Sequence, residues 1–362
     1  MVFNVQVLRA FAATLVVWVH AQELIAGQDI LPGWARDFGY GGVDMFFVIS
    51  GFIMVRTTQN KDVRPLVFIK KRIIRIVPMY YFFTFSTIAT AMVVPRAFNS
   101  THPEFSHMVK SLLFIPFEKT PDRIYPLYYL GWTLNFEMLF YCIFSISLLL
   151  AKPIRLFAVT MLLVALVALG ANVQNVADHG VAAYFYTRPI LLDFAFGMFV
   201  AWSFPSSAHV SDAKPWWCLL AAGAAWFVWG GEVFPVATLP IAPTTDTVLR
   251  FGVPSALIVA GATGLELAGF RIGNNLMRSS GDASYSIYLS HYFLIAGCII
   301  VADRLTLGGL GRILLLPVTM VAAVTLGFIT YHLLERPLAG DFETYHRIRT
   351  RLAVRRWRKN AE

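Results

Sequence analysis

The chain has 362 residues, of which 57% are hydrophobic and only 14% are charged, and its mean hydropathy is +0.62. A soluble domain carries about 25% charged residues, because its surface has to stay largely polar. The composition therefore excludes a soluble globular domain, a disordered chain and a nucleic-acid-binding module. On such an apolar chain the net charge of +9 indicates the cytoplasmic side of a membrane protein.

Apolar segments recur along the whole chain, and a spanning helix needs roughly 20 mostly apolar residues. This pattern predicts an all-α integral membrane protein with about ten transmembrane helices and one membrane domain over residues 1–340. The predicted spans cover residues 7–26, 40–56, 73–94, 131–151, 154–171, 187–204, 215–231, 248–268, 284–302 and 312–334.

The Lys and Arg residues predict the orientation. Most of the 30 basic residues fall on one side if both termini are cytoplasmic, which requires an even number of spans. Residues 341–362 then form a basic cytoplasmic tail near anionic lipid head groups. Alternatively, the tail is a topology signal with no other role.

The first span carries Arg9 and His20, which are 11 residues apart. Eleven residues make three helical turns plus about 20°, so both side chains lie on one helix face, roughly 16 Å apart along the axis. Ionisable residues inside a span are costly and indicate function. Alternatively, His20 is a packing residue and Arg9 extends to the membrane surface.

A basic run, Lys70-Lys71-Arg72-Ile73-Ile74-Arg75, precedes the third span. Arg72 and Arg75 are three residues apart and share a helix face. Paired guanidinium groups suit bidentate binding of phosphates. The alternative is that the run only marks the cytoplasmic side.

Glu137 lies about six residues inside the outer end of its span, and His20 lies at a matching depth. A carboxylate at that place could orient the imidazole and stabilise its protonated form. We therefore predict a His20–Glu137 pair, with packing against another polar group as the alternative for Glu137.

Tyr285, Tyr288 and His291 recur every three residues and form a polar stripe on one span. The stripe predicts either a lined cavity or a seam of hydrogen bonds between helices. We place Tyr288 and His291 with Arg9, Arg72 and Arg75 in a donor-binding site. Inner cations and a histidine farther out suit a donor with a phosphorylated head and a long thin arm, such as coenzyme A.

In these motifs the chain resembles the acyltransferase 3 family of membrane acyltransferases, most of all the exopolysaccharide and nodulation-factor O-acetyltransferases. The resemblance extends from about Asn4 to Pro337. It rests on Arg9-x10-His20, Gly42-Val43-Asp44-Met45-Phe46-Phe47-Val48-Ile49-Ser50-Gly51-Phe52, Lys71-Arg72-Ile73-Ile74-Arg75-Ile76-Val77-Pro78, Trp132-Thr133-Leu134-Asn135-Phe136-Glu137, Ser284-Tyr285-Ser286-Ile287-Tyr288-Leu289-Ser290-His291 and Tyr331-His332-x-x-Glu335-Arg336-Pro337.

The resemblance implies ten helices, an acyl-coenzyme A donor on the cytoplasmic side and an acceptor reached from the other side. It implies that His20 is the catalytic base and that Arg9, Arg72 and Arg75 serve the donor. We predict transfer of an acyl group from coenzyme A to a sugar hydroxyl of a surface glycan or its lipid-linked precursor, with acetyl as the favoured acyl group. The predicted location is a bacterial cytoplasmic membrane. Glu137 would assist His20, and an acyl-histidine intermediate stays open.

Two other functions compete with this prediction. A transporter or flippase of a glycan precursor could use the buried His and Glu as a proton relay. A non-catalytic partner of the polysaccharide synthesis machinery is the other alternative. The eight histidines are scattered without metal-ligand spacing, so we expect no metal cofactor.

Overall fold

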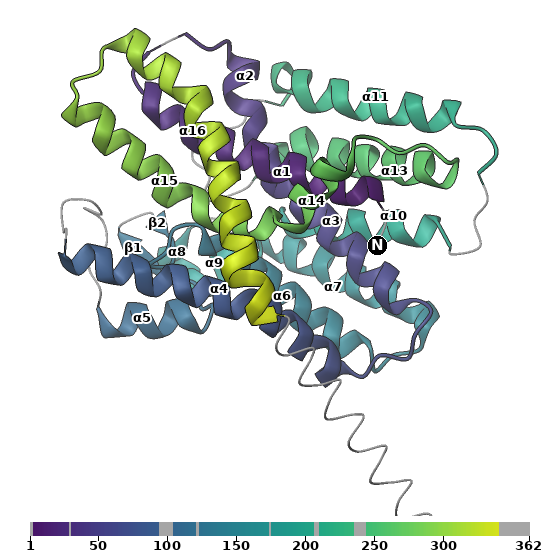
Figure 1. Cartoon of the computed structure of the whole chain (residues 1–362). Coiled ribbons are helices and arrows are strands. Elements are labelled where there is room, and N and C mark those ends of the chain that lie inside the picture. Colours follow the sequence, from purple (N-terminus) through teal and green to yellow (C-terminus); the bar gives the residue numbers. More distant parts are fainter. Residues whose placement is uncertain are drawn as a thin grey trace, which may run out of the picture.

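The chain folds into a bundle of helices in the computed structural model (Figure 1), which describes residues 3–28, 30–93, 104–120, 123–173, 175–205, 210–234 and 244–339. The described helices of 13 residues or more are α1 (Phe3–Ala21), α3 (Gly41–Thr58), α4 (Pro65–Val93), α6 (Gly131–Ser147), α7 (Lys152–Gly170), α10 (Leu191–Ser203), α11 (Lys214–Trp229), α13 (Val253–Leu267), α15 (Ser284–Arg304) and α16 (Gly309–Thr330).

Short elements connect these helices. One antiparallel hairpin pairs β1 (Glu118–Thr120) with β2 (Arg123–Ile124). The short helices are α2 (Gly33–Asp37), α5 (Phe105–Leu112), α8 (Val176–His179), α9 (Val181–Tyr186), α12 (Thr245–Thr247) and α14 (Asn275–Asp282), with 3-10 turns η1 (Gln22–Ile25), η2 (Phe38–Tyr40) and η4 (Gly230–Glu232) and π-helical turns η5 (Val248–Gly252) and η6 (Tyr331–Glu335).

Each of the ten predicted spans coincides with a helix, but the count of ten spans is not confirmed. Among the described residues, seven helical segments are long and apolar enough to cross a membrane. The other three predicted spans form α6, α10 and α11, with 17, 13 and 16 residues. At 1.5 Å per residue, a 13-residue helix covers about 20 Å, less than the roughly 30 Å hydrocarbon core.

Helix α1 lies in the middle of the bundle and packs on α3, α13, α14 and α15 (Figure 1). Most of its side chains are buried. By contrast, only 11% of the most apolar stretch of α7 is buried, and the rest faces outward. The ionisable residues of the central helix α1 therefore face protein, whereas α7 suits contact with lipid.

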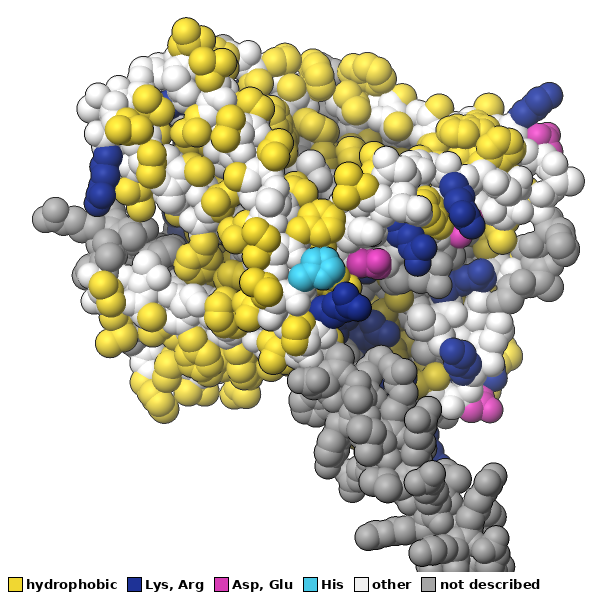
Figure 2. Space-filling model, viewed as in Figure 1, with side chains coloured by type: hydrophobic (Ala, Val, Ile, Leu, Met, Phe, Trp, Pro, Cys, Tyr) yellow, Lys and Arg dark blue, Asp and Glu magenta, His cyan; other side chains and the backbone are white. Residues whose placement is uncertain are grey.

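Charge is distributed unevenly on the visible surface. In Figure 2 most of the visible Lys and Arg side chains lie on the right half of the face, while the left half is largely hydrophobic. The loop between α3 and α4 is joined to the start of α7 by Lys152 and Asp62, whose nitrogen and oxygen are 3.0 Å apart. This ammonium lowers the pKa of the exposed Asp62 carboxyl. The gathering of cations agrees with the predicted basic side, while the orientation of the termini stays a prediction.

Helices α3 and α10 cross in backbone contact. A Cβ atom added at Gly51 would lie 2.0 Å from the carbonyl oxygen of Phe194, and one at Gly197 would lie 1.8 Å from that of Val48. Only glycine allows this approach, because the atoms that would be struck belong to the backbone. The crossing holds α3, which carries pocket residues, in place.

Substituting Gly197→Ala should therefore destabilise the fold by about 1–3 kcal/mol through overpacking. Gly297→Ala in α15 is a matched control, because a Cβ there meets nothing within 4 Å. Both changes gain the same helix propensity, so the difference in Tm between the two detergent-solubilised variants isolates the clash. Equal Tm values would show that the crossing can relax.

Candidate active site

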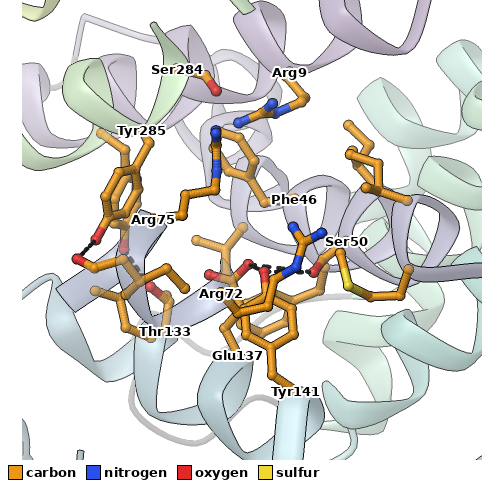
Figure 3. A pocket seen from close by; sticks show the side chains of 18 of the residues that line it. Arg9, Phe46, Ser50, Arg72, Arg75, Thr133, Glu137, Tyr141, Ser284 and Tyr285 are labelled. Carbon is orange, nitrogen blue, oxygen red and sulfur yellow. Dashed lines mark hydrogen bonds between the residues drawn. The ribbon is translucent and has the colours of Figure 1, made fainter. Parts of the chain in front are cut away.

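A pocket of about 220 Å³ lies among α1, α3, α4, α6 and α15 (Figure 3). Its lining combines apolar side chains from α3 with a polar set: Arg9, Ser50, Arg72, Arg75, Thr133, Glu137, Tyr141, Ser284, Tyr285 and Tyr288. Three guanidinium groups and one carboxylate therefore face the same space, which makes the pocket cationic.

Arg9 is held at the pocket by contacts near the start of α1. The Glu266 carboxylate of α13 accepts hydrogen bonds from the backbone nitrogens of Phe3 and Asn4, at 2.8 and 2.6 Å, and so caps the helix. Arg9 is 9% exposed, and its Nη1 donates to Gln6 Oε1 at 3.1 Å. Gln6 in turn donates to Asp282 at the end of α14. Arg9 is thus a positioned cation.

Arg72 and Arg75 reach the pocket from α4, which begins at Pro65 and includes the whole basic run. The Arg72 guanidinium lies 5.4 Å from the Phe68 ring centre and 5.8 Å from that of Tyr141. Arg75 Nη2 is 3.9 Å from Glu335 Oε1. Within the described chain, neither Arg72 Nε nor Arg75 Nη2 has a hydrogen-bond partner. Buried donors of this kind need an acceptor, and a phosphate supplies it.

Glu137 faces this pocket and its hydrogen bonds are to neighbours there. Its carboxylate accepts from the Tyr141 hydroxyl one turn along α6 and from Ser50 Oγ on α3 at 3.4 Å. The predicted His20–Glu137 pair is therefore corrected. Matching depth placed the two residues at one level, but Glu137 bonds Tyr141 of its own helix and Ser50 of α3, and His20 pairs with a residue of α15.

His20 instead pairs with His291 of α15. His291 Nε2 is 3.2 Å from His20 Nδ1, and the ring centres are 5.1 Å apart. His20 Nδ1 also lies 2.9 Å from the carbonyl oxygen of Val16, and His291 Nδ1 lies 3.1 Å from that of Ile287. A carbonyl oxygen only accepts, so each Nδ1 carries the proton. The neutral His20 then has its lone pair on Nε2.

The polar stripe on α15 proves to be divided between two roles. The hydroxyl groups of Tyr285 and Tyr288 bond the carbonyl oxygens of Ile76 and Leu130, at 2.8 and 2.9 Å, and that of Tyr288 also bonds Thr133. Both tyrosines line the pocket and are also part of a seam between helices. His291 does not line the pocket and lies beside His20, so its role toward the donor stays a prediction.

The pocket and the histidine pair are consecutive along α15. The Tyr288 ring centre lies 6.1 Å from that of His291 and 6.1 Å from that of Phe46 in the pocket wall. Arg9 and His20 both belong to the continuous helix α1. The molecule therefore places a cationic pocket and an imidazole pair at two levels of one helix.

Sequence reasoning did not assign Gln6, Tyr141 or Glu335 to this site, and it did not pair Ser50 with Glu137. Gln6 is one turn before Arg9, and Tyr141 is one turn after Glu137, so helical spacing could have indicated both. Ser50 and Glu335 join by contacts between distant helices; Glu335 accepts from Ser286 Oγ at 2.6 Å and lies near Arg75. Among the residues the structure describes, no three His, Cys, Asp or Glu side chains are grouped to hold a metal ion.

Comparison with known proteins identifies the fold family. The acyltransferase domain family (Acyl_transf_3) matches residues 2–332. The exopolysaccharide production protein ExoZ of Rhizobium meliloti (strain 1021) is 38% identical over 313 residues, which cover 83% of this chain and 89% of the relative. Nodulation protein 10 of Rhizobium leguminosarum bv. viciae is 26% identical over 380 residues, covering 98% and 95%. No solved structure gives a significant match. With its apolar helices and its match over nearly the whole chain, the protein belongs to the Acyl_transf_3 family of acyltransferases.

Proposed function

We propose that this membrane enzyme transfers an acetyl group from acetyl-coenzyme A to a hydroxyl group of an extracellular polysaccharide or of its lipid-linked precursor. The observation that carries the proposal is the pocket in which three arginines face one space, on the same helix bundle as the His20–His291 pair. The relatives named for exopolysaccharide production and for nodulation support a glycan as the acceptor.

The pocket fits the phosphorylated head of the donor. Arg72 Nε and Arg75 Nη2 are buried and have no hydrogen-bond partner among the described residues, although Arg75 Nη2 is 3.9 Å from Glu335 Oε1. Phosphate oxygens would accept hydrogen bonds from both. Arg9, which lines the same pocket (Figure 3), adds a third cation. The thioester end of the donor would then extend past Phe46 and Tyr288 toward His20, over the roughly 16 Å that separate Arg9 and His20 along α1.

In the proposed reaction His20 acts as general base. Its Nε2 takes the proton from the acceptor hydroxyl as that oxygen attacks the thioester carbonyl carbon. When the carbon–sulfur bond breaks, the protonated His20 returns the proton to the sulfur of coenzyme A. His291 accepts from His20 Nδ1–H and thereby holds the imidazole in the tautomer that leaves Nε2 free. Glu137 contributes from the pocket, by accepting hydrogen bonds from Ser50 and from Tyr141, whose ring packs against Arg72.

We further propose that the enzyme resides in the bacterial cytoplasmic membrane with both termini in the cytoplasm, residues 1–340 as the acyltransferase domain and residues 341–362 as a basic tail. The Lys and Arg residues between the end of α3 and the first turns of α4, residues 56–75, support this orientation. The tail lies outside the described residues. Tagging either terminus and testing its accessibility from the periplasm checks the proposal; a periplasmic C-terminus would require an odd number of spans.

The function is tested by supplying radiolabelled acetyl-coenzyme A to membranes and measuring label in the glycan fraction. Label should enter the glycan, should be released by mild alkali as expected for an ester, and should be absent from membranes without the protein. Absence of label with acetyl- and succinyl-coenzyme A alike, in membranes that contain folded protein, would contradict the proposed donor class.

The role of His291 gives a separate prediction. His291→Ala should lower kcat at least about tenfold, the equivalent of one lost hydrogen bond, while KM for acetyl-coenzyme A stays unchanged. His291→Gln should recover part of kcat, because its amide oxygen can accept from His20 Nδ1–H. A rise in KM for acetyl-coenzyme A with unchanged kcat would instead place His291 in the donor site.

A further inference from the structure

Two tyrosines that do not line the arginine pocket contact the ring of His20. The ring centres of Tyr129 and Tyr292 each lie 5.9 Å from that of His20, with interplanar angles of 83° and 88°. The two tyrosine rings lie 5.7 Å apart and nearly parallel, at 25°. Tyr125 packs on Tyr129 with 4.5 Å between ring centres. His20 thus stands perpendicular to a pair of stacked tyrosine rings.

These side chains remain accessible. His20, Tyr125, Tyr129 and Tyr292 are each half-buried, whereas His291 is fully buried. The cluster is therefore a partly open aromatic surface at the C-terminal end of α1. A ligand that approaches His20 from this side has to contact these rings.

The cluster is also held in place by its neighbours. Tyr128, adjacent to Tyr129, is buried; its hydroxyl bonds the carbonyl oxygen of Leu289, and its ring stacks on Phe83 at 5.8 Å. The backbone nitrogen of Leu127 donates to Ser111 Oγ at 2.9 Å. These bonds fix the turn that carries Tyr129 against α15, which carries Tyr292. A preformed surface of this kind loses little conformational entropy when it binds a ligand.

The composition of the cluster points to a sugar and not to a lipid tail. The chain contains 30 Phe and 14 Tyr residues, yet the two aromatic rings other than His291 that contact the His20 ring are both Tyr, and so is the next ring beyond them. A phenol ring offers a π face, which attracts the electropositive C–H groups on one side of a pyranose, and a hydroxyl that bonds its OH groups. Phenylalanine would offer only the face.

We propose that Tyr129 and Tyr292, with Tyr125 behind Tyr129, form the subsite that binds the hexopyranose unit of the acceptor and presents its hydroxyl to His20. The proposal rests on the acetyl transfer proposed above and adds the acceptor site to it. Donor and acceptor then approach His20 from opposite levels of α1: the donor from the arginine pocket, the sugar from the tyrosine cluster.

The test measures steady-state transfer from acetyl-coenzyme A to one defined acceptor, the alkali-deacylated extracellular polysaccharide of the source bacterium. Tyr129→Ala should raise KM for this polysaccharide roughly tenfold, with KM for acetyl-coenzyme A unchanged. Tyr129→Phe keeps the ring and should stay within about threefold of wild type. Tyr129→Leu keeps apolar volume without the π face, so it should behave like Tyr129→Ala and provides the result if the alanine variant fails to fold.

Trp34→Ala is the matched control, because Trp34 is an exposed aromatic residue near the same end of α1 but outside the cluster. If it raised the acceptor KM as much as Tyr129→Leu, the cluster would be part of a general membrane-interface belt. Unchanged acceptor KM in both Tyr129→Leu and Tyr292→Leu would overturn the subsite. Failure of the wild type itself to transfer label would instead count against the proposed function, and so the two failures are distinguishable.

Discussion

Replacing His20 by alanine should lower acetyl transfer by roughly 10²–10⁴-fold, the contribution of a positioned general base. The hydroxyl of a sugar is a weak nucleophile, and His20 is the imidazole whose Nε2 is left unprotonated by the bonds at Nδ1. Because His20 does not line the arginine pocket, the variant should still bind the donor. The measurement is label transfer to glycan alongside direct binding of coenzyme A to the same purified protein.

His332→Ala is the control for this experiment, since His332 is an exposed histidine in η6. It should retain wild-type transfer. Substantial turnover by His20→Ala would remove His20 from the proton transfer and would leave the histidine pair as a packing contact. Loss of coenzyme A binding together with transfer would indicate that α1 has moved and not that a base is missing.

The second large effect is expected at the arginines of α4. Arg75→Ala should raise KM for acetyl-coenzyme A by about 10- to 100-fold, because a hydrogen bond to a charged group contributes roughly 1.5–3 kcal/mol. The acceptor KM should change little. Arg72→Lys should also weaken donor use, because an ammonium cannot reproduce the planar fork of a guanidinium that stacks on Phe68 and Tyr141.

Lys71→Ala separates this effect from loss of positive charge in general. Lys71 lies on the same helix, between Lys70 and Arg72, but is exposed and does not line the pocket. Its removal should leave donor KM near the wild-type value. If Lys71→Ala and Arg75→Ala had equal effects, the basic run would act as a surface field and the pocket would lose its role. An equal rise in donor and acceptor KM for Arg75→Ala would indicate a fold defect, since Arg75 also lies near Glu335.

Several site residues followed from the sequence because helical geometry is local. The 11-residue spacing of Arg9 and His20 and the three-residue spacing of Arg72 and Arg75 place these pairs on single faces in any helix, and the structure has both pairs on single helices. The stripe of Tyr285, Tyr288 and His291 is equally local. The chemical roles of these residues stay proposals until the variants are measured.

The partners of these residues could not be predicted from the sequence, because they depend on how the helices cross. Glu137 and His20 have matching depths in the sequence, yet Glu137 bonds Tyr141 and Ser50, and His20 pairs with His291. A contact between two spans depends on the depth of each residue, on the rotation of each helix and on which helices are neighbours. The sequence of a single span indicates only the depth. Spacing likewise could not show that the hydroxyls of Tyr285 and Tyr288 are engaged with other helices.

Composition and apolar periodicity by themselves determined that this protein is a helical membrane protein, where its helices run and which of them carry ionisable residues, since burial of charge in lipid is costly for any fold. The tertiary structure alone decided that seven of the ten described helical segments are long and apolar enough to cross a membrane, which side chains support the arginine pocket, and that two tyrosines contact His20. Close packing sets these outcomes: glycine contacts such as Gly197 on Val48 choose which helices touch, and those choices bring residues hundreds of positions apart, such as His20 and His291, into contact.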